Sequence, residues 1–88
     1  MLTKERTLRE LAGKVDEHGL MIAQSERLLD AARERARALA RMGAPAAQLA
    51  EATDLTQRAM DACCEAMALY ARSMRRLLDY SARLSDKE

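Results

Sequence analysis

The chain has 88 residues, of which 33% are charged and 2% are aromatic, and its 15 basic and 14 acidic side chains leave a formal net charge of +1. This length allows one small domain, and the balanced charge gives no reason to expect an anionic membrane or nucleic acid as a partner. Val and Ile occur once each and Phe and Trp are absent, so a sheet is not expected. The wealth of Ala, Leu, Arg and Glu is typical of long helices and coiled coils.

The sequence gives no sign of export, membrane insertion or metal binding. No apolar run approaches the ~20 residues of a spanning helix, and the N-terminal residues lack the core of a signal peptide, so a cytoplasmic protein is expected. Cys63 and Cys64 are adjacent and point about 100° apart on a helix, which predicts reduced thiols. With a single histidine, neither a metal site nor a cofactor is expected.

A first helix is predicted over about residues 4–42. It can start at Thr3 or at Thr7, because Thr7 followed by Glu10 fits a capping box. Two series of mostly apolar residues then recur at seven-residue spacing, which predicts a coiled-coil seam. The first series is Leu8, Val15, Ile22, Leu29 and Ala36, and the second is Leu11, His18, Ser25, Ala32 and Leu39.

Two glycines weaken this helix. Gly13 and Gly19 each cost up to ~1 kcal/mol relative to Ala. A break at His18 and Gly19, with a short helix before a long one, is therefore an alternative. Because the seam passes through this point without a shift, one continuous helix is favoured.

A tight turn is predicted at residues 42–46. The sequence Met-Gly-Ala-Pro at residues 42–45 holds the only proline and one of three glycines. Gly43 can adopt the left-handed conformation that ends a helix, and Pro45 is preset for the first turn of the next one.

A second helix is predicted over about residues 46–84, with residues 85–88 fraying because they have no apolar anchor. Its apolar residues alternate at spacings of three and four, which again predicts a seam. The predicted seam is Leu49, Thr53, Thr56, Met60, Cys63, Met67, Tyr70, Met74, Leu77, Ser81 and Leu84.

The predicted fold is therefore all-α, an antiparallel two-helix hairpin. Folding at the turn pairs positions whose numbers sum to roughly 88, so that His18 faces Tyr70. The basic end of the first helix then meets the acidic start of the second, which predicts ion pairs such as Arg37 with Glu51. The others predicted are Arg27 with Asp61, and Arg72, Arg75 and Arg76 with Glu10, Asp16 and Glu17.

More apolar residues are present than one interface between two helices can use, and a lone hairpin of this size is a poor candidate for independent stability. A partner is therefore predicted, either a second copy that completes a four-helix bundle or a different protein. The stripe of Met60, Met67 and Met74 fits a core better than an adaptable binding face. The candidate partner-binding residues are Leu20, Met21, Leu28, Leu55, Leu69, Met60 and Met67.

Catalysis is not expected, because the chain has no phosphate loop and no nucleophile–base arrangement that two helices could assemble. His18 lies at a seam position, so a hydrogen-bonded layer with Tyr70 is a better interpretation than a general base. The arginines between Arg33 and Arg41 could contact RNA. Acidic neighbours from the second helix and the lack of aromatic residues argue against nucleic acid.

Around the turn the chain reads Leu-Ala-Arg-Met-Gly-Ala-Pro over residues 39–45, and this stretch resembles a known family. Small cytosolic hairpin proteins of the YscE/PscE type, co-chaperones of the type III secretion needle subunit, have an Ala/Leu/Arg-rich first helix, a turn of the form Leu-Ala-Arg-Gly-X-X-Pro and a Gln-containing second helix. The chain has one more residue before the glycine and is longer at both ends. The matching residues are Leu39, Ala40, Arg41, Met42, Gly43, Ala44 and Pro45, with Gln48 following and residues 26–32 upstream.

The resemblance implies a non-enzymatic protein that packs against a tetratricopeptide-like helical-repeat chaperone and keeps the needle subunit monomeric in the cytosol. The residues alone leave a second hypothesis open, a homodimeric four-helix bundle with a scaffold or regulatory role, able to bind nucleic acid through its arginines. Both hypotheses require an exposed apolar stripe.

Overall fold

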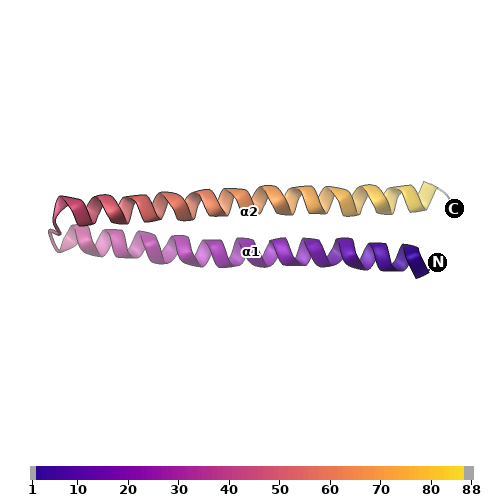
Figure 1. Ribbon diagram of the computed structural model, residues 1–88, viewed down its shortest axis with the longest axis horizontal. Coiled ribbons are helices and arrows are strands. Elements are labelled where there is room, and N and C mark those ends of the chain that lie inside the picture. The colour runs from indigo at the N-terminus through magenta and orange to yellow at the C-terminus, as the bar shows by residue number, and fades with distance from the viewer. Residues whose placement is uncertain (1, 87–88) are drawn as a thin grey trace.

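The structure, a computed structural model, describes residues 2–86. Two helices, α1 (Leu2–Arg41) and α2 (Ala46–Asp86), lie side by side and antiparallel, and the N- and C-termini lie at the same end of the molecule (Figure 1). The hairpin measures 66 × 16 × 14 Å. This arrangement confirms the predicted all-α antiparallel hairpin and its turn.

The turn stops α1 through backbone hydrogen bonds that only a left-handed residue permits. Gly43 has φ of 69°, and its N–H donates to the carbonyl of Ala40 at 3.1 Å. The N–H of Ala44 donates to the carbonyl of Leu39 at 3.0 Å, which completes a Schellman motif. Pro45 follows immediately, and its carbonyl accepts the first hydrogen bonds of α2.

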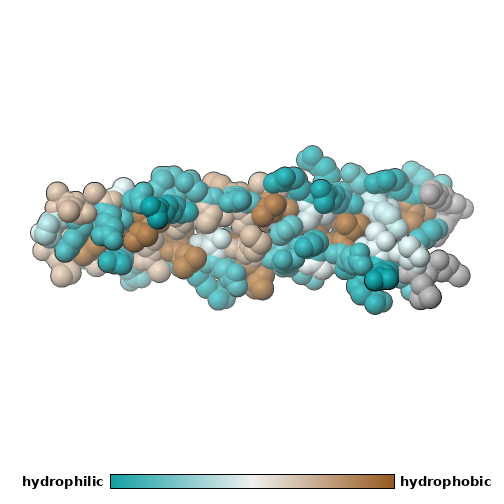
Figure 2. Space-filling model, viewed as in Figure 1, coloured by the Kyte–Doolittle hydropathy of each residue, from teal (hydrophilic) through white to brown (hydrophobic). Residues whose placement is uncertain are grey.

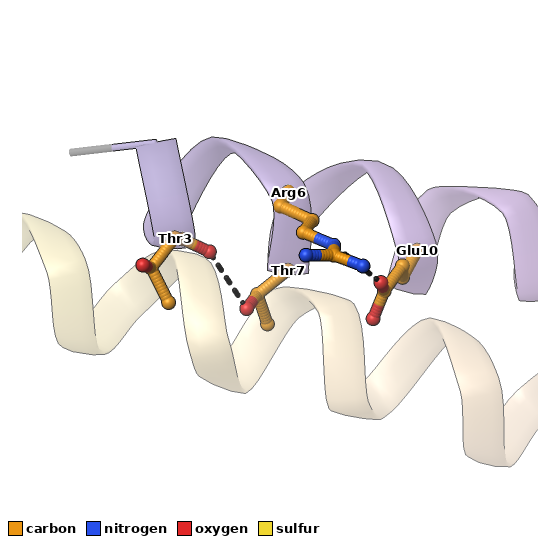
Figure 3. A network of polar contacts seen from close by, with 4 residues as sticks. All are labelled: Thr3, Arg6, Thr7 and Glu10. Carbon is orange, nitrogen blue, oxygen red and sulfur yellow. Dashed lines mark hydrogen bonds and ion pairs between the residues drawn. The ribbon is translucent and has the colours of Figure 1, made fainter.

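Helix α1 begins ahead of both predicted caps. The Thr7 hydroxyl donates to the Thr3 carbonyl at 2.9 Å, and the Arg6 side chain pairs with Glu10 at 3.4 Å (Figure 3). The prediction of a helix start at Thr7 with a capping box is therefore wrong. Residues 4–6, Lys-Glu-Arg, are good helix formers, so nothing in the sequence stops the helix from extending toward the N-terminus.

The glycines do not interrupt α1, so the alternative of a break at His18 and Gly19 is wrong. Gly19 instead provides space for a ring of the opposite helix. A methyl group on Gly19 would lie 3.4 Å from Cε1 of Tyr70. The pairing of these two residues is close to the predicted register.

The seam of α1 is confirmed at all its predicted positions, each of which is buried or half-buried. The seam of α2 is confirmed in one series and wrong in the other. The confirmed series consists of Leu49, Thr56, Cys63, Tyr70, Leu77 and Leu84. The second series in the structure consists of Ala52, Ala59, Ala66, Ser73 and Tyr80, one position before the predicted Thr53, Met60, Met67, Met74 and Ser81.

Small side chains explain this shift. Ala52, Ala66 and Ser73 are buried, whereas Met60 and Met67 are exposed. Alanine and serine let the two backbones approach closely, and methionine in the same place would hold them apart. Within residues 2–86 no large side chain is fully buried, so the hairpin has a thin core.

The predicted ion pairs between the helices are wrong for the part of the chain that the structure describes. The pairs found there are Arg6–Glu10, Lys14–Glu17 and Arg58–Asp54, each within one helix. Heptad geometry gives the reason. Arg27 and Asp61 lie on the outer sides of their helices, and Arg37 and Glu51 lie on opposite broad sides of the hairpin.

Candidate functional site

The seam divides the remaining surface of the hairpin into two broad sides. In each helix the seam consists of two series, which begin at Leu8 and Leu11 in α1 and at Leu49 and Ala52 in α2. Residues one position before the first series lie on one flank of the helix, and residues one position after the second series lie on the other flank. In an antiparallel pair, like flanks of the two helices meet on the same side. Surface hollows agree with this geometry, because one contains Lys14 and Leu69 and another contains Arg33 and Met60. Leu69 and Met60 therefore lie on opposite sides.

Four of the predicted partner-binding residues share one side, which we call the Leu face: Met21 and Leu28 from α1, and Leu55 and Leu69 from α2. Leu28 is 65% exposed, Met21 and Leu55 are exposed to a smaller extent, and Leu69 is half-buried. The space-filling view of one broad side shows that hydrophobic residues form a broken row along both helices between hydrophilic ones (Figure 2). Hydrophobic side chains at helical spacing suit the docking of another helix.

The other two predicted residues that flank the seam, Met60 and Met67, lie on the opposite side. Met67 is 55% exposed and Met60 39% exposed. The interpretation of this methionine stripe as core is therefore wrong for the hairpin itself, and only Met74 is half-buried. Leu20 is also exposed, but on the outer side of α1, away from both faces.

His18 lies beside a small surface groove of about 140 Å³ lined by both helices. Its Nδ1 atom is buried and has no hydrogen-bond partner among the described residues. The predicted hydrogen-bonded layer with Tyr70 is therefore wrong, because the Tyr70 ring packs against Gly19. The groove is lined by Leu11, Lys14, His18, Leu69, Arg72, Ser73 and Arg76. It is smaller than the roughly 300–1,000 Å³ of a typical ligand pocket, and no carboxylate lines it.

The arginines at the end of α1 line a separate hollow of about 380 Å³. Arg33, Arg37 and Arg41 share it with Asp30 and Glu34. The acidic neighbours therefore come from α1 itself and not from α2, contrary to the expectation from the sequence.

The cysteines do not form a disulfide among the described residues. Cys63 is buried in the seam, Cys64 is exposed, and both thiols are free. Residues 2–86 contain no cluster of three or more His, Cys, Asp or Glu side chains that could hold a metal ion. Over the same range, neither helix has an apolar stretch that could cross a membrane.

Comparisons of the chain with family models, with curated proteins and with solved structures give no match. The resemblance to type III secretion co-chaperones therefore remains a prediction from the residues around the turn. The features of the hairpin that bear on its function are its exposed apolar faces.

Proposed function

We propose that the chain is a non-enzymatic protein-interaction module that is completed by a helical partner. Its closest functional analogy is a type III secretion needle co-chaperone, which binds a helical-repeat chaperone and helps to keep the needle subunit monomeric in the cytosol.

The observation that carries the proposal is the excess surface of the hairpin. The chain exposes 6975 Å², whereas a compact monomer of 9.8 kDa exposes roughly 5,200 Å². The difference of roughly 1,800 Å² per chain exceeds the ~800 Å² that each partner contributes to a standard protein interface. A chain with this surface is stabilised by association, and apolar side chains are available for it.

The Leu face supports a helical partner in particular. Met21 and Leu28 are seven residues apart on α1, and Leu55 and Leu69 are fourteen apart on α2, so they repeat at the period of a helix seam. Apolar side chains that repeat at this period fit the groove between helices of a repeat protein.

The test is a pull-down from an extract of the native cells, with bound chains identified by mass. The bait is the wild-type chain, Leu28→Glu on the Leu face, or Ala68→Glu on the outer side of α2 as a matched control. Both substituted positions are exposed, so folding is retained and circular dichroism verifies it. We expect a stoichiometric helical-repeat protein on the wild type and on A68E, and its loss on L28E.

A different outcome contradicts the proposal. If only untagged copies of the chain are captured and the purified protein sediments as a dimer that L28E dissociates, the Leu face joins two copies. The chain would then be a homodimeric four-helix bundle, and the co-chaperone proposal would be abandoned.

A further inference from the structure

A second surface lies opposite the Leu face and has its own complete helical repeat. We call it the Met face. Its α2 residues alternate at spacings of four and three, so they repeat the pattern of a coiled-coil seam outside the seam that the hairpin uses. They are Met60, Cys64, Met67, Ala71, Met74 and Leu78. All except half-buried Met74 are exposed, and Leu78 is 60% exposed.

The neighbouring part of α1 leaves room for another helix. On this side α1 presents Ala12 and Ala23, which are small and half-buried. The flexible side chains of the Met face therefore project beside a strip of small α1 side chains, which we call the shelf. The apolar stripe covers residues 60–78, which is about 27 Å of helix, or five turns.

Acidic side chains form the α1 rim of this shelf. Asp16, Glu26 and Asp30 are exposed on the same side of the hairpin, and none forms an ion pair within residues 2–86. Basic side chains lie at both ends of this rim. Arg33 and Arg37 lie toward the turn, where they share a hollow with Met60, and Arg9 lies on the same side toward the chain ends. Between Arg33 and Asp16 the α1 rim therefore carries only negative charge.

We propose that the Met face binds a basic amphipathic α-helix of about 18 residues. Methionine side chains repack around varied apolar surfaces, the seam-like spacing matches a helix, and the acidic rim complements Lys or Arg beside the apolar stripe of the ligand. This binding is independent of the proposed function, because it uses the opposite side of the hairpin. One chain could therefore hold two helical partners at once.

The methionines provide reporters for a direct test. In protein labelled with 13C at the methionine methyl groups, Met60 and Met67 report on the Met face, Met21 on the Leu face and Met42 on the turn. The probe is a synthetic peptide with leucines at seam spacing and lysines at the flanking positions. The matched control peptide carries Glu in place of each Lys.

We expect the Lys peptide to shift the Met60 and Met67 signals and to leave those of Met21 and Met42 in place. The Glu peptide should bind at least about tenfold more weakly, a difference of about 1.4 kcal/mol. Net charge does not explain this preference, since the whole chain carries +1. Met67→Glu should lower the affinity for the Lys peptide by a similar factor, and Leu28→Glu should not change it.

Glu26→Lys tests the rim separately, because it should weaken binding of the Lys peptide and strengthen that of the Glu peptide. The proposal is overturned if the Lys peptide does not bind, if Met21 shifts as much as Met67, or if both peptides bind equally. It is also overturned if Met60 and Met67 shift with protein concentration alone, because a second copy of the chain would then occupy the face.

Discussion

Gly43 and Gly13 are both glycines, but their backbone conformations differ. Replacing each of them by alanine should therefore have opposite effects on the free energy of unfolding. Gly43 has φ of 69°, in the left-handed region, whereas Gly13 lies inside α1 with no atom near the site of a Cβ. A left-handed conformation costs a residue with a side chain about 1–2 kcal/mol, and a helical glycine costs up to ~1 kcal/mol relative to alanine.

We predict that Gly43→Ala lowers the free energy of unfolding by about 1–2 kcal/mol and that Gly13→Ala raises it by up to ~1 kcal/mol. Urea unfolding followed by circular dichroism measures both values. A stabilising Gly43→Ala would show that the turn does not end in a left-handed residue.

Gly19 differs from Gly13 because a ring occupies the space beside it. Gly19→Leu should drive the new side chain into the Tyr70 ring and lower the free energy of unfolding by about 1–3 kcal/mol. In the background of Tyr70→Ala the same substitution should cost much less, because the ring is gone. A double-mutant cycle measures this coupling, and independent effects of the two substitutions would contradict the packing of Tyr70 on Gly19.

At the scale of the helices, the sequence predicts the hairpin, its turn and the whole seam of α1, but only half of the seam of α2. The turn residues and the seven-residue repeat depend on local chemistry, which a sequence displays directly. In α2 two neighbouring series both alternate with the Leu49 series at spacings of three and four. One contains Ala52 and Ala66, and the other contains Met60 and Met67. Hydrophobicity favours the methionines, whereas close approach of two helices favours alanine.

The candidate site is harder to predict for the same reason. The sequence identifies the surplus apolar residues, but assigning them to a side requires the correct seam. Moving one series by one position places Met60 and Met67 on the opposite side from Leu55 and Leu69. The Nδ1 atom of His18 has no partner among the described residues because the Tyr70 ring packs on Gly19. The register of the two helices alone does not predict this orientation of the ring.

Adjacent residues of α2 test the seam directly. Ala66 is 1% exposed, whereas Met67 is 55% exposed. We predict that Ala66→Leu overpacks the seam and destabilises the hairpin by about 1–3 kcal/mol, whereas Met67→Leu changes stability by less than about 0.5 kcal/mol. Thermal unfolding of the two variants in parallel measures this contrast. If Met67→Leu changed the stability more than Ala66→Leu, the seam of α2 would contain Met67, as hydrophobicity alone predicts.

At the scale of the whole molecule, charge contributes little to the fold. The ion pairs among the described residues are exposed and local, each within one helix. Exposed pairs of this type contribute about 0.3–0.5 kcal/mol each. The hairpin is held together by its thin apolar seam and by any partner that covers its faces.

The concentration of salt should therefore affect the stability of the hairpin and its binding to a basic helix differently. We predict that raising NaCl from about 0.1 M to 1 M, which shortens the Debye length from about 10 Å to 3 Å, changes the free energy of unfolding by less than about 1 kcal/mol. The same change should weaken binding of a basic helix to the Met face, where charge complementarity contributes. Chemical unfolding with urea at both salt concentrations gives the first value. A strong loss of stability in high salt would indicate ion pairs between the helices.

The position of the single turn, halfway along the chain, also determines the order in which the hairpin assembles. Pairs of facing residues next to the turn are few residues apart in sequence, and each further layer closes a loop that the previous layer has already shortened. Assembly should therefore proceed like a zipper from Gly43 toward the chain ends, and opening should begin where the termini lie together. Amide hydrogen exchange should be slowest near Ala52 and become faster toward Leu8 and Leu84. The end that carries both termini is then the natural place for a protease or an unfoldase to start.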